Sequence, residues 1–158
     1  MKKIVLVTCL LVLLDQMSKL LIRTFLSLYE TITIIPSFFN ITYVQNTGAA
    51  FSMLEGKQWI FIIASIVVLC AIIVYLKQKT IDKIDVIIFS LIIGGIIGNL
   101  IDRLFLNYVT DFIEFIIFSK NMPIFNIADT FICIGCLLLV FKEDLCKNLN
   151  ISKKKINE

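Results

Sequence analysis

The sequence predicts an α-helical membrane protein with four transmembrane helices and a small β-rich platform outside the membrane. The chain has 158 residues, of which 59% are hydrophobic, whereas roughly half of a soluble domain is apolar. Its mean hydropathy is +0.95. Long apolar runs alternate with polar segments, and a run of about 20 apolar residues can cross a bilayer as a helix. We therefore expect one domain over residues 1–158, with spans at residues 4–22, 59–76, 86–101 and 125–141.

The first apolar run follows Lys2 and Lys3, and it has the charged start and apolar core of a signal peptide. No convincing small-residue cleavage site follows it, so we expect the segment to be retained as the first span. Asp15 and Lys19 lie four residues apart on one helix face, in the order that favours an ion pair. A structural pair and a role in binding substrate at the headgroup level are both open for these two residues.

The first long connection, residues 24–58, is expected to lie outside the membrane and to contain short strands. Residues 31–54 carry no charge. The β-branched and aromatic residues of ITI and NITYV partly alternate, which is typical of strands. Pro36 and Asn46-Thr47-Gly48 supply turn residues. This stretch is therefore predicted to form the β-rich platform on the membrane surface.

The second span is the clearest, because residues 59–76 form an apolar run without a charge. The second outer connection, residues 104–122, contains VTDFIEFIIF, whose mixture of apolar and acidic residues suits an interface between membrane and water. The tail, residues 142–158, is rich in lysine and is expected to be solvated and frayed.

Lysine placement predicts the orientation. Lysines near the N-terminus, between the second and third spans, and in the tail all lie on one side of a four-span protein. Positive residues favour the cytoplasmic side of a membrane. We therefore expect both termini in the cytoplasm and both long connections outside.

In that topology, the polar residues of the spans gather at one depth near the outer surface. They are Asp15, Lys19, Asn99, Asp102, Arg103, Asn126 and Asp129, and the outer connections add Asn46 and Asp111. Ionisable groups at membrane depth are costly and by default indicate function. Since the chain has no histidine, carboxylates are the leading candidates for acid–base chemistry. Two neighbouring carboxyl groups do not both ionise easily, so such a pair would share a proton.

Most of these residues also have a structural interpretation. Arg103 can snorkel from a helix end or pair with a carboxylate or a lipid phosphate, and Asn126 can cap the helix that carries Asp129. Asp111 stands between apolar neighbours and is expected at an interface, where burial would raise its pKa. Asp102 competes with Asp111 as the partner of Asp129. Because Arg103 is adjacent to Asp102, we expect Asp102 to stay ionised and structural, and we rank it third.

Small residues suggest helix packing more than chemistry. Gly94, Gly95 and Gly98 let another helix approach closely in lipid, and no GK[ST] sequence follows to make a phosphate-binding loop. Cys133 and Cys136 have CxxC spacing without a second pair or a histidine. We expect these cysteines to pack between helices, and we predict no metal and no cofactor.

Five motifs follow one another along the chain. They are DQMSK from Asp15, NTGAAF from Asn46, GGIIGNLIDR from Gly94, VTDF from Val109 and PIFNIAD from Pro123. In this order and spacing they resemble the successive motifs of the lipoprotein signal peptidase family, also called signal peptidase II. One motif alone would be weak, but five in order are highly specific. The resemblance covers nearly the whole chain up to residue 141, and no motif position departs from the family pattern.

The resemblance implies an aspartyl endopeptidase of the bacterial cytoplasmic membrane, with its active site facing the extracytoplasmic side. Its substrates would be prolipoproteins that carry a diacylglyceryl group on a cysteine, and it would cut before that cysteine to free the signal peptide. The family's catalytic pair falls on Asp111 and Asp129. Supporting, substrate-binding or lipid-binding roles fall on Asp15, Lys19, Asn46, Asn99, Asp102, Arg103 and Asn126. Gly48 is expected to add a polar contact with the substrate.

Other classes of function are open from the residues alone. Paired acids with Asn, Lys and Arg in a four-span bundle could conduct ions or protons, although the cytoplasmic half of every expected span is apolar. A non-catalytic assembly factor that uses GxxxG packing would leave the clustered acids unexplained. A nucleic-acid partner is not expected, because the chain has no stripe of Lys and Arg with interleaved aromatics. We expect a monomer whose partners are its substrates and membrane lipids.

Overall fold

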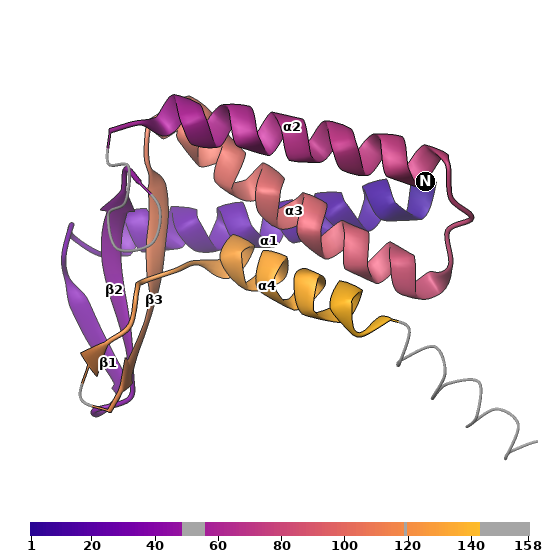
Figure 1. Ribbon diagram of the computed structural model, residues 1–158. Helices are drawn as coiled ribbons and strands as arrows, with labels where there is room; N and C mark the ends of the chain where they lie inside the picture. The colour runs from indigo at the N-terminus through magenta and orange to yellow at the C-terminus, as the bar shows by residue number, and fades with distance from the viewer. Residues whose placement is uncertain (49–55, 119, 143–158) are drawn as a thin grey trace, which may run out of the picture.

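The protein consists of a helical bundle with a small antiparallel sheet at one end (Figure 1). The structure is a computed structural model and describes residues 1–48, 56–118 and 120–142. The helices are α1 (Lys2–Phe25), α2 (Gln58–Lys77), α3 (Lys83–Leu106) and α4 (Ile127–Val140). Helix α3 packs against each of the other three. Every apolar run identified in the sequence therefore forms a helix.

The helices differ in length. Among the described residues, α1, α2 and α3 are the helices long and apolar enough to cross a membrane. Helix α4 has 14 residues, or about 21 Å at a rise of 1.5 Å per residue, against a hydrocarbon core of about 30 Å. It is shorter than the span expected over residues 125–141 because Asn126 is extended and caps it.

Helix α3 is longer than the apolar run over residues 86–101. It begins with a capping box, in which Asp82 Oδ1 accepts from the Asp85 amide at 2.7 Å and Asp85 Oδ2 accepts from the Asp82 amide at 3.2 Å. It ends at Asn107, whose φ of 62° is left-handed and stops the helix. Asp102 and Arg103 consequently lie inside the helix near its end, with Arg103 in the last turn.

The sheet has four strands in the order β1-β2-β3-β4, and each strand is antiparallel to its neighbour. The strands are β1 (Thr31–Ile35), β2 (Phe39–Asn46), β3 (Val109–Ile117) and β4 (Lys120–Asn121). The strands predicted at ITI and NITYV are confirmed as β1 and β2. The rest of the expected platform, residues 49–54, lies outside the described residues. Strand β3 comes from the second connection, where the sequence indicates an interface but no strand.

Pairing of β2 with β3 joins the two outer connections. Val44 lies opposite Asp111, and a register irregularity between Ile41 and Val44 turns the end of β2. The chain before α4 is fixed to the same strand, because the Phe125 carbonyl accepts from the Ile113 amide at 2.7 Å and the Phe125 amide donates back at 3.1 Å. The start of α4 is therefore tied to the strand that carries Asp111.

Small residues let α4 lie very close to α3. A Cβ on Gly95 would collide with the Ala128 carbonyl oxygen, and one on Gly135 of α4 would lie 2.6 Å from Ile92 Cγ1. The expected close packing of the glycine-rich stretch is confirmed. Cys133 and Cys136 are exposed, so the expectation that they pack between helices is wrong. The reason is that α4 turns its smallest residues toward α3 and leaves the cysteines on its outer face.

The close packing generates a stability prediction. Gly95→Ala is expected to lower the free energy of unfolding by about 1–3 kcal/mol, because backbone and not only side chains must move. Gly94→Ala is the matched control, since its Cβ would meet Leu11 Cβ at 3.1 Å, a milder contact that a shift of a few tenths of an ångström relieves. The measurement is denaturant or thermal unfolding of the detergent-solubilised protein. Equal destabilisation by both substitutions would contradict this account of the helix contact.

Candidate active site

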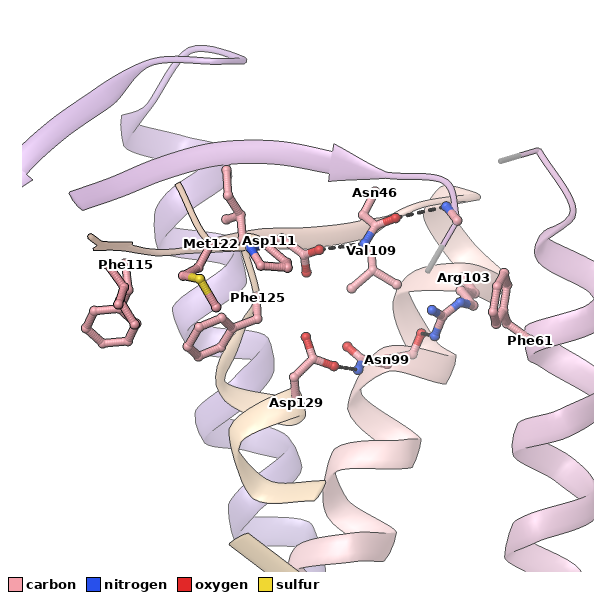
Figure 2. A pocket seen from close by; sticks show the side chains of 14 residues that line it. Asn46, Phe61, Asn99, Arg103, Val109, Asp111, Phe115, Met122, Phe125 and Asp129 are labelled. Carbon is pink, nitrogen blue, oxygen red and sulfur yellow. Dashed lines mark hydrogen bonds between the residues drawn. The ribbon is translucent and has the colours of Figure 1, made fainter. Parts of the chain in front are cut away.

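A cavity of about 520 Å³ lies where the sheet meets the ends of the helices (Figure 2). Its polar lining residues are Asn46, Gly48, Asn99, Arg103, Asp111 and Asp129. The rest of its wall is mainly apolar and includes Phe61, Phe115 and Phe125. The cavity therefore combines a small polar centre with an apolar surface, which is typical of sites that bind a largely apolar ligand.

Asp111 of β3 is almost fully buried, with 2% of its surface exposed. Its Oδ2 accepts from Asn46 Nδ2 at 2.8 Å, and its Oδ1 accepts from Asn126 Nδ2 at 2.7 Å. Burial and the nearby charge of Asp129 raise the pKa of Asp111 to about 7, although both amide hydrogen bonds oppose the rise. The pKa of Asp111 is thus raised, as its apolar neighbours in the sequence predict.

Asp129 stands in the first turn of α4 and turns its carboxyl group toward Asp111 (Figure 2). Its Oδ1 accepts from Asn99 Nδ2 at 2.7 Å, and its Oδ2 accepts from the Asn126 amide at 3.2 Å. The second contact completes a capping box with Asn126. Asp129 therefore takes part in capping α4 and also lines the cavity.

Asn126 connects the two carboxyl groups. Its side chain is fully buried, and its Oδ1 accepts from the Asp129 amide at 3.0 Å. Its Nδ2 is within hydrogen-bond distance of Asp111 Oδ1 and, at 3.1 Å, of Asn99 Oδ1. One amide side chain thus caps α4 and also fixes the strand carboxyl group relative to that helix.

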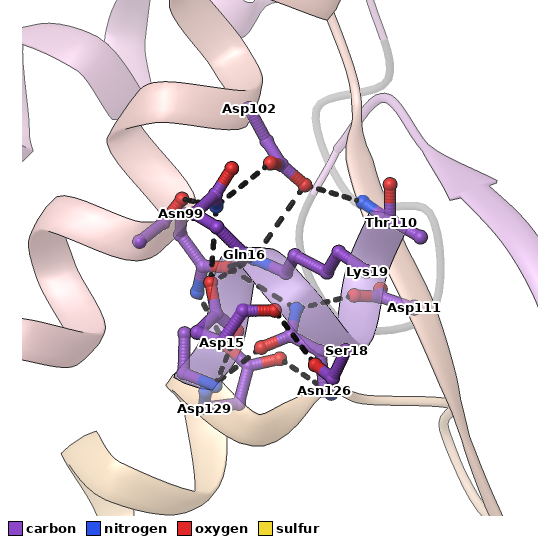
Figure 3. Close-up of polar contacts among 12 residues, drawn as sticks. Asp15, Gln16, Ser18, Lys19, Asn99, Asp102, Thr110, Asp111, Asn126 and Asp129 are labelled. Carbon is purple, nitrogen blue, oxygen red and sulfur yellow. Dashed lines mark hydrogen bonds and ion pairs between the residues drawn. The ribbon is translucent and has the colours of Figure 1, made fainter. Parts of the chain in front are cut away.

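Lys19 and Asp15 of α1 lie behind the cavity wall and not in its lining (Figure 3). The expected i,i+4 ion pair is present, with Lys19 Nζ 2.9 Å from Asp15 Oδ2, and both side chains are fully buried. Lys19 also donates to Asn99 Oδ1 at 2.9 Å. Asp15 Oδ1 accepts from the Ala128 amide at 3.0 Å, so it neutralises an otherwise unpaired donor at the start of α4.

Asp102 is also buried behind the cavity, with 1% of its surface exposed. Its Oδ2 lies 3.5 Å from Lys19 Nζ and accepts from the Thr110 amide at 2.9 Å. Arg23 Nη1 is 3.9 Å from its Oδ1. Among the described residues no ion pair joins Asp102 to Arg103, because consecutive residues on a helix point in different directions. The cations of Asp102 come from α1 instead.

Arg103 lines the cavity and stacks on Phe61 of α2, with Cζ 5.0 Å from the ring centroid. Its Nη1 donates to the Asn99 carbonyl at 3.5 Å. Its Nε is buried and has no hydrogen-bond partner among the described residues. Arg103 therefore keeps donor capacity that a ligand in the cavity can use.

Some residues of the site were not singled out from the sequence. Gln16 donates to Asp102 Oδ1 at 3.1 Å and to the Gly98 carbonyl at 3.0 Å. The sequence offered one signal for Gln16, namely its place beside Asp15. It offered no signal for Phe61, because one aromatic residue in an apolar span is unremarkable. Gly48 donates its amide to Asn46 Oδ1 at 2.9 Å, and the remainder of the NTGAAF motif lies outside the described residues.

No group of three or more His, Cys, Asp or Glu side chains in residues 1–48, 56–118 and 120–142 is arranged to hold a metal ion. The chemistry available in the cavity is that of two carboxyl groups, two side-chain amides and one guanidinium group. Carboxyl groups in such an arrangement can take and give protons. Amide and guanidinium donors can stabilise an oxygen that gains negative charge.

Comparison with known proteins identifies the family. The family model for signal peptidase (SPase) II matches residues 7–143. A lipoprotein signal peptidase of Halothermothrix orenii is 40% identical over 134 residues, which are 85% of this chain and 90% of that protein. One from Halalkalibacterium halodurans is 39% identical over 137 residues, covering 86% of this chain and 88% of that protein.

Solved structures agree with the sequence comparison. A bacterial membrane enzyme solved at 2.3 Å resolution has a TM-score of 0.82 and 34% identity, over 95% of this chain and 92% of that chain. A second, solved at 1.9 Å, has a TM-score of 0.80 and 35% identity, over 90% and 92%. The fold, the ordered motifs and these relatives lead to one conclusion: the chain belongs to the lipoprotein signal peptidase (signal peptidase II) family of bacterial membrane proteases.

Proposed function

We propose that this protease uses Asp111 and Asp129 as a catalytic pair to remove signal peptides from diacylglyceryl-modified prolipoproteins. The observation that carries the proposal is the meeting of two carboxyl groups, from β3 and α4, in one largely apolar cavity. With its pKa raised to about 7, Asp111 keeps a proton up to nearly neutral pH, and in the proposed reactive state the two carboxyl groups share one proton. That is the state an aspartyl protease requires.

In the proposed reaction, the ionised carboxylate removes a proton from a water molecule, and the water oxygen attacks the carbonyl carbon before the lipid-modified cysteine. The protonated carboxyl group donates its proton to the carbonyl oxygen, which gives a neutral tetrahedral diol. The diol then breaks its C–N bond, with one proton moving to the leaving amine and one returning to the pair. The titration belongs to both acids together, so neither is assigned a fixed role.

The supporting residues fall into two groups. Asn46, Asn99 and Asn126 donate to the two carboxyl groups and hold them for reaction. Arg103 and Gly48 line the cavity and are the proposed contacts for polar groups of the substrate peptide. Asp15, Lys19 and Asp102 form buried ion pairs outside the cavity lining. In the proposed site these ion pairs hold the surrounding side chains in place.

The proposed membrane arrangement has four spans, both termini in the cytoplasm and the cavity at the outer surface. Lysine placement supports it, and so does the polar lining of the cavity where the sheet meets the ends of the helices (Figure 2). Helix α4 would cross the remaining depth with its flanking residues. In this arrangement the diacylglyceryl chains lie among lipid tails while the scissile bond lies at headgroup depth. We propose a single-domain monomer that works in contact with membrane lipids.

An ion-conducting or proton-conducting role is not favoured. A conduction path needs polar groups at successive depths. An apolar cluster that includes Ile4, Ile88, Phe89 and Ile92 lies farther along the bundle, between the cavity and its opposite end. An assembly factor without catalysis would not account for two buried carboxyl groups that share a cavity.

Substitution of the pair tests the proposed roles. Asp111→Asn and Asp129→Asn are each expected to lower kcat at least about a hundredfold, because an amide can neither take nor give the required proton. Asp102→Asn should retain measurable turnover, since Asp102 lies outside the cavity lining. The measurement is cleavage of a diacylglyceryl-modified prolipoprotein by purified protein in detergent, with folding checked by elution and melting.

The activities of these variants decide which carboxyl groups form the catalytic pair. If Asp102→Asn is inactive and Asp111→Asn is active, the catalytic pair is wrong while the protease activity stands. If unmodified prolipoprotein is cut as well as the lipid-modified form, the proposed substrate class is wrong.

The pH dependence of kcat should reflect the shared proton. Because the pKa of Asp111 is raised to about 7, the pair loses its last proton as the pH rises through that value. We expect kcat to be highest on the acidic side of pH 7 and to fall above it. The measurement is kcat from pH 4.5 to pH 9 at saturating substrate. A rate that is constant up to pH 9 would contradict the proposed protonation state.

The same shift predicts a pH-dependent gain in stability for Asp111→Asn. The pKa of Asp111 rises from 3.8 to about 7 on folding, so the folded state holds this proton more tightly. Its contribution to stability is fully present below pH 3.8 and is lost as the pH rises through about 7. Asparagine cannot ionise and avoids that loss. The melting temperature of the variant relative to wild type should therefore increase from pH 4 to pH 8; a constant difference would refute the linkage.

A further inference from the structure

A second polar cluster lies at the end of the bundle opposite the cavity. We call it the inner clamp, and it consists of Lys79, Asp82, Asp85 and Lys142. Lys142 Nζ lies 2.9 Å from Asp82 Oδ2 and 2.5 Å from Asp85 Oδ1. The Asp85 side chain is fully buried. The clamp therefore joins Lys142, the second residue after α4, to the N-cap and first turn of α3.

The ion pair of Lys142 is more than charge neutralisation of Asp85. Lys79 Nζ already lies 3.1 Å from Asp85 Oδ1, and the Asp82 amide donates to its other oxygen. A lysine just past a membrane helix normally extends into the headgroup region and water. Here only 15% of the Lys142 side chain is exposed. Lys142 supplies the second positive charge of the clamp, which balances its two carboxylates, and in doing so its side chain is held against the start of α3.

The contact between α3 and α4 is mainly apolar along its length, and its side-chain hydrogen bonds lie at the outer end, where Asn99 contacts Asp129 and Asn126. At Gly95 and Gly135 the two helices touch through small residues and backbone. Apolar packing of this kind is not directional, whereas hydrogen bonds and ion pairs have defined geometry. Directional contacts hold α4 at its two ends. At the outer end Asp15 accepts from the Ala128 amide, and at the inner end Lys142 is bound by α3.

The position of α4 matters because Asp129 lies in its first turn and Asp111 lies on a strand. Asp129 and Lys142 are about 20 Å apart along the helix at 1.5 Å per residue. A helix transmits a displacement of one end to the other, and a misplacement of about 1 Å can cost a hundredfold in rate. A tilt or slide of α4 would therefore alter the geometry of the two acids.

We propose that Lys142, bound by Asp82 and Asp85, is a positioning residue that sets the axial position of α4 and so the placement of Asp129 against Asp111. The proposal rests on the catalytic pair assigned above. It predicts that weakening the clamp slows chemistry without weakening substrate binding, even though the clamp lies a full helix length from the cavity.

The test compares Lys142→Met, Lys142→Arg and Lys83→Met in the full chain. Lys142→Met keeps the aliphatic stem and removes the charge, while Lys142→Arg keeps a cation. Lys83 is exposed, stands at the start of α3 and has no ion pair among the described residues, so its substitution controls for loss of one positive charge. The measurements are kcat and KM for a diacylglyceryl-modified prolipoprotein, with melting temperatures for each variant.

We expect kcat of Lys142→Met to fall about tenfold while KM stays within about twofold of wild type. Lys142→Arg should recover most of the rate, and Lys83→Met should match wild type. A kcat for Lys142→Met equal to that of Lys83→Met overturns the proposal. So does a rise in KM with unchanged kcat, which would indicate altered binding and not altered placement of Asp129.

A milder variant decides the matter if Lys142→Met does not fold. Asp82→Asn keeps the side-chain oxygen that caps α3 and weakens the contact with Lys142; its kcat must then fall relative to wild type, and an unchanged kcat refutes the clamp. The assignment of the catalytic pair is tested separately. If that assignment is wrong, Asp129→Asn will be active, whatever the activity of the Lys142 variants.

Discussion

The polar architecture depends on one buried ammonium group. Lys19 Nζ is 2.9 Å from Asp15 Oδ2 and 2.9 Å from Asn99 Oδ1, and its side chain is fully buried. A buried ion needs close partners, and removal of one partner leaves an uncompensated charge. Lys19 therefore gathers carboxylates from α1 and α3. Asn99 Oδ1 accepts from Lys19 and from Asn126, so its Nδ2 faces Asp129 and donates to it.

The acids of the site differ in their polar partners. Asp15 and Asp102 lie within 4 Å of a cation, whereas Asp111 and Asp129 receive amide hydrogen bonds and form no ion pair among the described residues. The ion-paired acids lie outside the cavity lining, and the two acids bound by neutral donors line it. We therefore propose that the ion-paired acids hold the network together and that the other two exchange protons.

The sequence predicted the four helices, β1, β2 and the gathering of polar residues at one end, because apolar runs, alternation and charge placement are local signals. It did not reveal β3. Both faces of VTDFIEFII carry buried residues, so the alternation that marks a half-buried strand is absent. Nor did it give the cations of Asp102, since contacts between helices depend on how they are rotated. The inner clamp was equally hidden, because Lys142 and Asp85 meet only after α4 has packed along α3.

The shortness of α4 connects these observations. This 14-residue helix carries Asp129 in its first turn, next to the strand that carries Asp111. The backbone pairing of Phe125 with Ile113 and the capping box of Asn126 fix the start of α4 to that strand. Farther along, α4 contacts α3 through glycines, isoleucines and backbone. The ion pairs of Lys142 join the far end of α4 to the start of α3, and in the proposed clamp this second attachment completes the placement of the helix.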